Sequence, residues 1–205
     1  MTTAKWRTIA LLVMTGSFSI LIFMVWNGET NLFDVGLRNW ALSLNTPTSV
    51  LVWKDISVLG SGVVLSGLTF LSLAIFATRR NWRACLQLAL AMGGAVAFDT
   101  VIKWTVQRPR PAEVYANTLP ISYSFPSGHA LFSFAFYMSI AWIVSRQSGN
   151  NWKNGLWVVA ILMAALIGAS RIFLGVHYGS DVLGGYLIAA AWLMLLATST
   201  RMRKA

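Results

Sequence analysis

The chain has 205 residues, 57% of them hydrophobic, and a mean hydropathy of +0.64, which is too apolar for an ordinary soluble domain. Its net charge of +10 suggests a nucleic-acid partner, but the basic residues stand singly between apolar runs rather than in one stripe, so no nucleic acid is expected. The only cysteine, Cys85, excludes an internal disulfide and a cysteine metal cluster.

Apolar runs long enough to cross a hydrocarbon core, which takes roughly 20 helical residues, recur along the chain. They predict one all-α domain over residues 1–205, a bundle of six transmembrane helices near Ile9–Trp26, Ile56–Ala77, Ala84–Lys103, His129–Ser145, Asn154–Arg171 and Asp181–Thr198. The first run follows Lys5 and Arg7 as a signal peptide would. No small-x-small cleavage site follows it, so we expect it to remain as an anchor.

A further short helix is predicted between the first two runs. Apolar side chains recur there at helical spacing, at Phe33, Leu37, Trp40, Ala41 and Leu44. Asp34, Arg38 and Asn39 lie on other faces of such a helix. The pattern favours a helix in the outer membrane interface, and an irregular loop is the alternative.

The orientation in the membrane follows from the Lys and Arg residues, which are enriched in short cytoplasmic loops. An even number of spans puts both termini on one side. That side holds ten of the sixteen basic residues: Lys5, Arg7, Arg79, Arg80, Arg83, Arg146, Lys153, Arg201, Arg203 and Lys204. Both termini are therefore expected in the cytoplasm.

Charged groups within spans or at their ends are costly unless they pair or serve a site. Here they fall in three clusters: Lys103 with Arg110 and Pro111, then Pro126-Ser127-Gly128-His129, then Ser170-Arg171 with His177 and Asp181. Successive spans alternate in direction, so the end of the third, the start of the fourth, the end of the fifth and the start of the sixth share one face. Topology alone thus predicts one shared site, and the distribution of Lys and Arg puts it at the periplasmic or outer face.

The cations of this site suit a phosphate group. Lys103, Arg110 and Arg171 supply positive charge and N–H donors for the dispersed charge of a phosphoryl group. Pro126 is suited to start a helix. The N–H groups of Ser127-Gly128 are then expected to point at the anion.

Both histidines of the chain belong to the same site. His177 and Asp181 are four residues apart and share one helix face. Asp181 can accept the Nδ1–H of His177, which leaves the Nε2 lone pair free to attack phosphorus. His129 is placed to protonate the leaving lipid oxygen. This pattern predicts a phosphohistidine intermediate that water hydrolyses.

A metal ion is not expected in this site. Mg²⁺ prefers oxygen ligands, and only Asp181, Asp99 and Glu113 are candidates near the cations. The cations already supply the positive charge that a metal would bring, so we expect no cofactor.

These residues form a recognisable set: Lys103-x6-Arg110-Pro111, Pro126-Ser127-Gly128-His129 and Ser170-Arg171-x5-His177-x3-Asp181. The set resembles, at every position, the three-part signature of the type 2 phosphatidic acid phosphatase superfamily, over residues 103–181. The resemblance implies a metal-independent phosphatase with His177 as nucleophile, Asp181 as its partner and His129 as the acid. It also implies phosphate binding by Lys103, Arg110, Ser127, Gly128 and Arg171, and, with the chain's size, a bacterial inner membrane.

Several neighbouring residues have two interpretations. Asp99 can pair with Lys103 for structure or to tune it. Arg108 can contact substrate or lipid headgroups, or do neither. Ser170 is suited to cap or pack, and the glycines at 60, 62, 93 and 94 favour close helix packing.

The leading functional hypothesis is a hydrolase acting on a membrane lipid phosphate or diphosphate. Undecaprenyl diphosphate and phosphatidylglycerophosphate are the first candidates, followed by phosphatidic acid, diacylglycerol diphosphate and the 1-phosphate of lipid A. A phosphotransferase that passes the phosphoryl group to another lipid is the alternative. A non-enzymatic lipid transporter is a remote one, because the charges cluster at one face rather than near the midplane.

Overall fold

The computed structural model describes residues 3–111, 122–146 and 153–202. Within these ranges the chain forms helices and no strand: α1 Thr3–Trp26, α2 Asn31–Ser43, α3 Pro47–Val58, α4 Gly62–Thr78, α5 Trp82–Val106, α6 Gly128–Ser145, α7 Lys153–Phe173 and α8 Gly179–Met202. Six stretches are long and apolar enough to cross a membrane, with α3 and α4 together forming one of them. The predicted all-α fold with six spans is confirmed.

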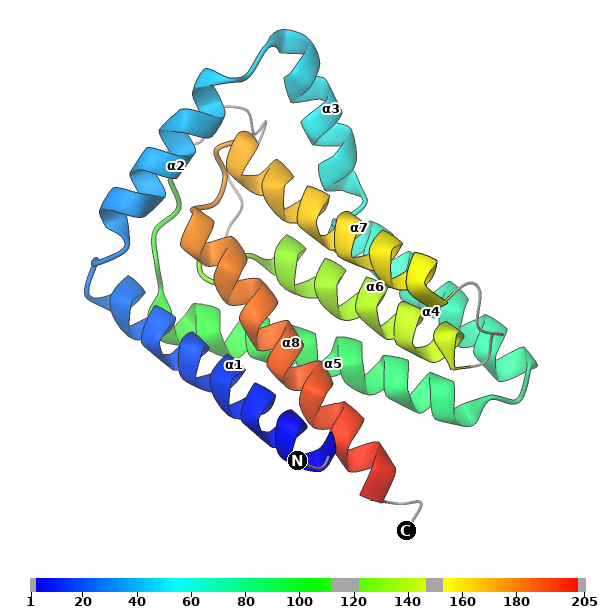
Figure 1. Ribbon diagram of the computed structural model, residues 1–205. Helices are drawn as coiled ribbons and strands as arrows, with labels where there is room; N and C mark the ends of the chain where they lie inside the picture. The colour runs from blue at the N-terminus through cyan, green and yellow to red at the C-terminus, as the bar shows by residue number, and fades with distance from the viewer. Residues whose placement is uncertain (1–2, 112–121, 147–152, 203–205) are drawn as a thin grey trace.

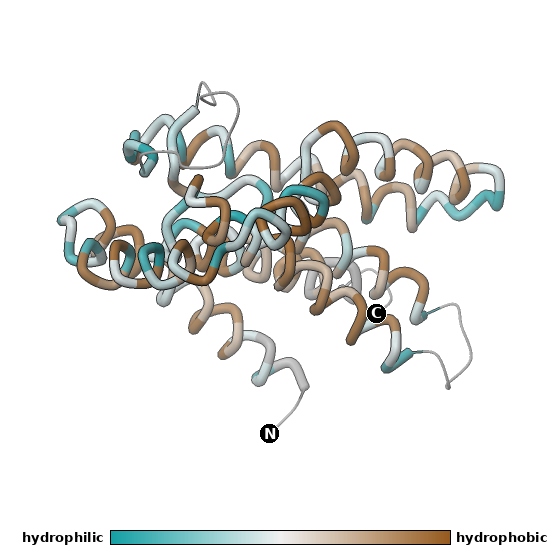
Figure 2. Tube along the Cα trace, turned by 90° about the horizontal axis from the view of Figure 1, so that it is seen from above, coloured by the Kyte–Doolittle hydropathy of each residue, from teal (hydrophilic) through white to brown (hydrophobic). Residues whose placement is uncertain are grey.

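Helix α6 lies at the centre of the bundle and packs against α4, α5, α7 and α8, while α1 packs along α8 (Figure 1). Small side chains from three of these helices, Ala95, Ala135 and Ala189, are buried together around Leu131. Small residues let transmembrane helices approach closely, which replaces the hydrophobic driving force that lipid does not provide. Hydrophobic residues predominate along the bundle helices, and hydrophilic residues gather toward their ends (Figure 2).

The second predicted span, Ile56–Ala77, is interrupted in the structure. Helix α3 begins with a capping box between Thr46 and Ser49, and α4 is capped by Ser61, whose hydroxyl accepts the N–H of Val64. At Gly60, between the two helices, a Cβ would lie 2.3 Å from Cγ2 of Ile167 on α7. The break therefore lets the chain pass directly against the neighbouring helix.

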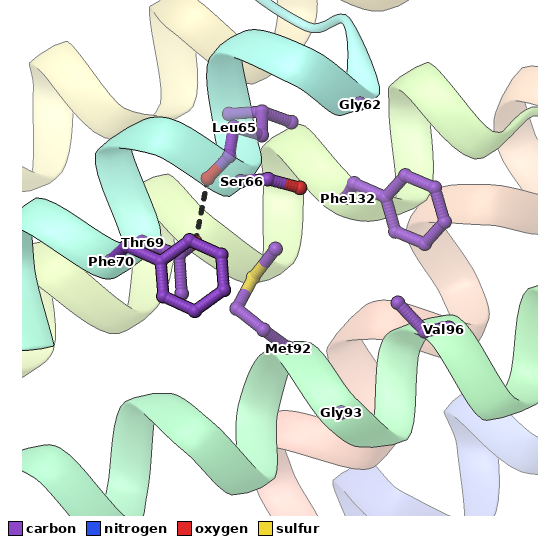
Figure 3. Close-up of a pocket in the computed structure, with 9 residues that line it drawn as sticks. All are labelled: Gly62, Leu65, Ser66, Thr69, Phe70, Met92, Gly93, Val96 and Phe132. Carbon is purple, nitrogen blue, oxygen red and sulfur yellow. Dashed lines mark hydrogen bonds between the residues drawn. The ribbon is translucent and has the colours of Figure 1, made fainter.

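The other glycines of this region divide into two kinds. A Cβ at Gly94 would lie 2.3 Å from the Trp192 ring, so Gly60 and Gly94 do allow close packing, as expected. Nothing lies within 4 Å of a Cβ at Gly62 or Gly93, so the packing interpretation is wrong there. Both instead line an apolar cavity of about 200 Å³ between α4, α5 and α6 (Figure 3).

Helix α2 confirms the predicted short helix. Unlike an amphipathic helix of a soluble protein, it buries a charged side chain and exposes apolar ones. Asp34 and Ala41 are buried against the bundle, whereas Phe33, Trp40 and Leu44 are more than half exposed. The helix packs on α7 and α8 (Figure 1). Its polar Asp34 therefore faces the protein, whereas Phe33 and Trp40 stay more than half exposed even though Trp40 also packs against Phe173, as suits a helix in a membrane interface.

The two termini lie at one end of the bundle, and the end of α5, the start of α6, the end of α7 and the start of α8 lie at the other, beside α2 (Figure 1). The motifs predicted to share one face of the membrane therefore do share one end of the bundle.

Candidate active site

A tight turn between α7 and α8 presents His177. Gly175 adopts a φ of +72°, which is disfavoured for residues with a Cβ, and reverses the chain at the end of α7. The N–H groups of Val176 and His177 then both donate to the Arg171 carbonyl, at 3.1 and 3.3 Å. His177 is thereby placed just before α8, with its side chain 2% exposed.

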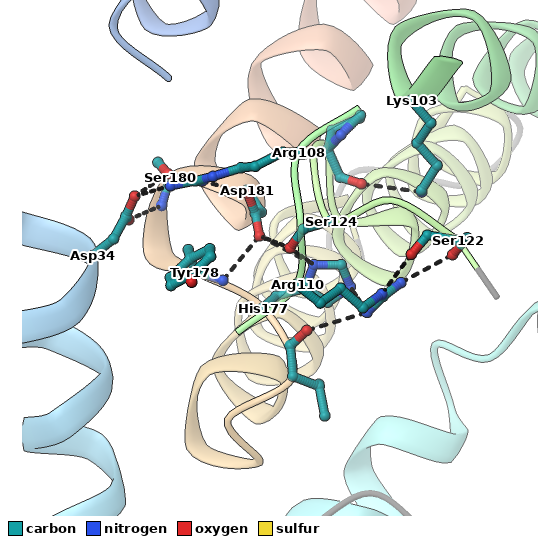
Figure 4. A network of polar contacts seen from close by, with 12 residues as sticks. Asp34, Lys103, Arg108, Arg110, Ser122, Ser124, His177, Tyr178, Ser180 and Asp181 are labelled. Carbon is teal, nitrogen blue, oxygen red and sulfur yellow. Dashed lines mark hydrogen bonds and ion pairs between the residues drawn. The ribbon is translucent and has the colours of Figure 1, made fainter. Parts of the chain in front are cut away.

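The imidazole of His177 is held at both nitrogens (Figure 4). Nδ1 lies 3.3 Å from Oδ2 of Asp181, and Nε2 lies 3.1 Å from a guanidinium nitrogen of Arg110. A carboxylate only accepts and a guanidinium only donates, so the proton belongs on Nδ1 and the lone pair on Nε2. This is the tautomer that nucleophilic attack by Nε2 requires.

The carboxylate of Asp181 is fully buried and saturated with donors. Its Oδ2 accepts from the Ser124 hydroxyl at 2.5 Å and from the Tyr178 N–H at 2.9 Å, and its Oδ1 accepts from Arg108 at 2.6 Å. The Tyr178 bond also caps the start of α8. These bonds fix the carboxylate so that Oδ2 faces His177.

The Lys103 ammonium lies at the beginning of α6. It forms an ion pair with Asp99 one turn earlier on α5, as the spacing predicted, and donates to the Pro126 carbonyl at 3.1 Å. A Cβ on Gly128 would lie 3.5 Å from Nζ of Lys103 and 3.2 Å from Asp99. The structure therefore brings Lys103 and Gly128 together, and a side chain at 128 would crowd them.

The expected phosphate cradle at Ser127 is partly wrong. The Ser127 N–H donates to the Asp181 carbonyl at 2.9 Å, so it is not available to an anion. Pro126 follows a cis peptide bond and precedes the N-cap residue Ser127 instead of starting the helix. The Ser127 hydroxyl, however, is buried and has no hydrogen-bond partner among the described residues. This hydroxyl, rather than the N–H, is the group able to donate to a ligand.

His129 and Arg171 complete the predicted set. His129 is the second residue of α6 and packs beside Gly60, where a Cβ would lie 3.3 Å from its ring. Arg171, Arg110 and Lys103 are all close enough to act electrostatically on His129, as is His177. Arg171 also donates to the Ser57 hydroxyl from α3. The eight predicted site residues therefore gather at one end of the bundle.

The remaining predicted residues have clear places. Arg108 is buried between Asp34 and Asp181 rather than facing substrate or lipid. The Ser170 hydroxyl bonds the Ile167 carbonyl of its own helix, in keeping with a packing role. Glu113, one of the carboxylates weighed for a metal, lies outside the described residues. No group of three His, Cys, Asp or Glu side chains suited to a metal occurs within residues 3–111, 122–146 and 153–202.

Sequence reasoning missed four residues: Asp34, Ser57, Ser124 and Ser180. The serines carry no signal, because a hydroxyl in a membrane protein usually bonds its own helix. Asp34 carried one, since it is one of only six acidic residues and stands in an apolar stretch.

Burial lowers the pKa of His177 to about 4, against the opposing effect of Asp181, and the charge of Arg110 adds to the lowering. Between about pH 6.5, the ordinary value, and about pH 4, the unfolded chain binds a proton at this position that the folded protein does not. His177 therefore favours unfolding as the pH falls through this range. At neutral pH it is unprotonated and ready to attack.

We expect ¹⁵N NMR of the histidine rings in detergent micelles to show His177 neutral from pH 8 to pH 5, with protonation beginning only near its pKa of about 4. The chain has two histidines, so a His129→Asn variant assigns the signals. Protonation of His177 with an ordinary midpoint near pH 6.5 would contradict the buried position.

Comparison with known proteins places this geometry in context. The family model described as PAP2 superfamily matches residues 84–205. Phosphatidylglycerophosphatase B of Bacillus subtilis is 28% identical over 87% of this chain and 89% of its own length. An undecaprenyl-diphosphatase of Sulfolobus acidocaldarius is 28% identical over 58% of this chain and 56% of its own.

Two solved structures share the fold. The transmembrane PAP2-type phosphatidylglycerolphosphate phosphatase of Bacillus subtilis superposes with a TM-score of 0.85 at 27% identity, over 94% of this chain and 96% of that one. Aquifex aeolicus LpxE superposes with a TM-score of 0.60 at 24% identity, over 80% of this chain and 93% of its own, and shows the fold alone.

Proposed function

Because this chain belongs to the PAP2 superfamily, we propose that it is a multi-pass membrane phosphatase that hydrolyses a lipid phosphate or diphosphate through a phosphohistidine at His177. The observation that carries the proposal is the fixing of His177, with Asp181 at Nδ1 and Arg110 at Nε2. This arrangement provides a nucleophile of the right tautomer beside a cation that binds phosphate.

In the first step, Nε2 of His177 attacks phosphorus and the bond from phosphorus to the lipid oxygen breaks. His129 gives its proton to that oxygen, and an anionic phosphate beside His129 favours the protonated imidazole that this transfer needs. Arg110, Lys103 and Arg171 stabilise the charge on the phosphoryl oxygens. Asp181 stabilises the positive charge that forms on the His177 ring.

In the second step, water attacks phosphorus, His129 takes a proton from that water, and the P–N bond breaks to release inorganic phosphate. His177 regains its lone pair and His129 its proton. Each residue ends in its starting state, so the bonds and protons balance over the cycle without a redox partner.

The substrate class follows from the surroundings of the site. The apolar cavity lined by Gly62, Met92 and Phe132 lies close to the start of α6, where the Phe132 ring would be 3.2 Å from a Cβ at Gly128 (Figure 3). Apolar surface that approaches the site through Phe132 supports a lipid ester rather than a soluble one. Undecaprenyl diphosphate and phosphatidylglycerophosphate remain the first candidates.

The membrane orientation is part of the proposal. Both termini lie in the cytoplasm and the site faces the periplasm or outside of a bacterial inner membrane, because basic residues concentrate on the side of the termini. The test is to fuse to the C-terminus a reporter enzyme that is active only outside the cytoplasm. Activity of that reporter would reverse this assignment.

The direct test is release of inorganic phosphate by the purified protein in detergent, from a panel of the candidate lipids, with His177→Ala as the inactive control. Release without an added acceptor lipid supports hydrolysis. Phosphate transfer that appears only with an acceptor lipid would make the protein a phosphotransferase. No reaction by the folded protein with any lipid, with or without acceptor, would contradict the proposed function.

We expect EDTA to leave the rate of phosphate release almost unchanged. Lys103, Arg110 and Arg171 supply the charge that Mg²⁺ supplies in metal-dependent phosphatases. The measurement compares initial rates after dialysis against EDTA with rates in added Mg²⁺. Loss of activity in EDTA that Mg²⁺ restores would overturn the metal-free mechanism.

A further inference from the structure

We propose that Asp34 on α2 is a positioning residue for the reaction, which holds Arg108 and, through it, fixes Asp181 against His177. The inference rests on the proposed function, because it gives Asp34 a role in the chemistry of that same site. Asp34 lies outside the three motifs, and its side chain bonds Arg108 and Ser180 rather than either histidine within the described residues. Its effect is therefore exerted through its neighbours.

Asp34 is a fully buried carboxylate with a complete set of donors (Figure 4). Oδ1 accepts the Ser180 N–H at 2.9 Å, and Oδ2 accepts the Ser180 hydroxyl at 2.6 Å and Arg108 at 2.7 Å. A buried charge persists only where it is paired and hydrogen-bonded. These contacts join α2 to the first turn of α8, directly before Asp181.

Arg108 connects this carboxylate to the catalytic one. Its Nη2 bonds Asp34, while its Nη1 bonds Oδ1 of Asp181 at 2.6 Å and the Ser180 hydroxyl at 2.7 Å. The guanidinium carbon lies 4.3 Å from the centre of the Tyr178 ring. The flat, rigid fork of an arginine thus spans two carboxylates, which an ammonium group cannot do in the same geometry.

Asp34 determines how Arg108 meets Asp181. Because Asp34 occupies one side of the guanidinium, Arg108 offers Asp181 a single N–H, and only Oδ1 is engaged. Oδ2 remains directed at Nδ1 of His177. Without Asp34, the guanidinium would keep Asp181 as its one carboxylate beside the neutral Ser180 and Thr30 hydroxyls. It would then be drawn to bind Asp181 through both oxygens, because bidentate pairs are the stronger geometry. That rotation would draw Oδ2 away from His177.

The same helix also holds the turn that carries His177. Arg38 donates through Nε to the Gly175 carbonyl at 3.3 Å, and Asn45, just beyond α2, donates to the Phe173 carbonyl at 2.7 Å. A Cβ at Gly179 would lie 2.5 Å from Leu37. Helix α2 and Asn45 therefore contact the chain both before and after His177. Among these contacts, Asp34 is the carboxylate that is linked to Asp181 through a single residue, Arg108.

The test is the Asp34→Asn variant, assayed on the lipid that the wild-type protein cleaves. An amide cannot accept at both of the positions where Asp34 accepts, so one of these bonds is lost, and the negative charge that pairs with Arg108 is removed in either orientation with almost no change in volume. We expect kcat to fall roughly 10- to 100-fold, as when an outer partner of a catalytic group is removed, with KM little changed. The matched control is Asp55→Asn, an exposed carboxylate on α3, which should retain wild-type kinetics.

A double-mutant cycle with Arg108→Lys separates this role from a general structural one. If Asp34 acts through Arg108, the double variant should be about as slow as the slower single variant. Losses that multiply would contradict the proposal, as would an Asp34→Asn variant with wild-type kcat. An Asp34→Asn change that raised KM alone would also contradict it.

If Asp34→Asn does not fold, Ser180→Ala provides a milder form of the test, because it removes the hydroxyl that donates to Asp34 and accepts from Arg108 but leaves their direct ion pair in place. It should lower kcat in the wild-type background and have no further effect with Arg108→Lys. Equal losses in both backgrounds would overturn the proposal. Failure of the proposed function is a separate result, since the wild-type protein would then release no phosphate at all.

Discussion

Replacing His177 by alanine should reduce lipid phosphate hydrolysis by at least roughly 10⁴-fold, a loss of the size seen when a covalent nucleophile is removed. The reason is that Asp181 holds the ring proton of His177 on Nδ1, which leaves a lone pair on Nε2. Arg110, 3.1 Å from Nε2, is the cation that binds the phosphate beside this nucleophile. The measurement is the initial rate of phosphate release, with helix content and thermal unfolding recorded to show that the variant is folded.

The informative control for this prediction is His129→Ala. With a substrate whose leaving group needs no proton, such as p-nitrophenyl phosphate, the His129 variant should still transfer phosphate to the protein, whereas the His177 variant should not. Because the chain has two histidines, trapped phosphohistidine can be assigned unambiguously between them. Trapped phosphate on His129, or an active His177→Ala variant, would contradict the assigned roles.

The clustering of the motifs at one end of the bundle could be predicted from the sequence because alternation of spans is a strict geometric constraint. Lys103 near the end of α5 and Gly128 at the start of α6 come together, as do Arg110 and His177, for this reason. The spans themselves could be predicted because backbone polar groups in lipid are satisfied within a helix, which requires long apolar runs.

The arrangement of α2 could not be predicted in the same way. Its apolar spacing predicted a helix in the membrane interface, but it did not predict that Asp34 would be buried against the bundle while Phe33 and Trp40 stay more than half exposed. Hydrophobic periodicity identifies a helix but does not say which neighbour each face meets. The partner of Asp34 is Arg108, 74 positions away along the chain, and only the three-dimensional structure brings the two together.

Backbone details were also beyond the sequence. Ser127 follows Pro126 in a pattern typical of a helix start with free N–H groups, but its N–H is bonded to the Asp181 carbonyl from α8. The break between α3 and α4 at Gly60 depends on the position of Ile167 in α7. Both features arise from contacts between helices far apart in sequence, which local propensity does not encode.

The second large effect is expected for Asp181→Asn, which should lower kcat by about 10³- to 10⁴-fold, comparable to the loss when the carboxylate that orients a catalytic histidine becomes an amide. Arg108 at Oδ1 demands an acceptor, so the asparagine oxygen would turn toward Arg108 and its NH₂ group toward His177. A donor facing Nδ1 favours the ring proton on Nε2, where it would displace the guanidinium of Arg110. The lone pair that attacks phosphorus is then lost.

The alternative orientation of the amide is no better, because its NH₂ group would face the guanidinium of Arg108. In the wild-type protein the Tyr178 N–H donates to Oδ2 at 2.9 Å. In the favoured orientation of the variant, that N–H would face the NH₂ group and lose its acceptor, so we expect a lower unfolding temperature as well. Ring ¹⁵N shifts distinguish the two tautomers directly and, with kcat measured below the unfolding temperature, separate the chemical effect from the structural one. An Asp181→Asn protein with the proton still on Nδ1 and wild-type kcat would show that His177 does not depend on this carboxylate.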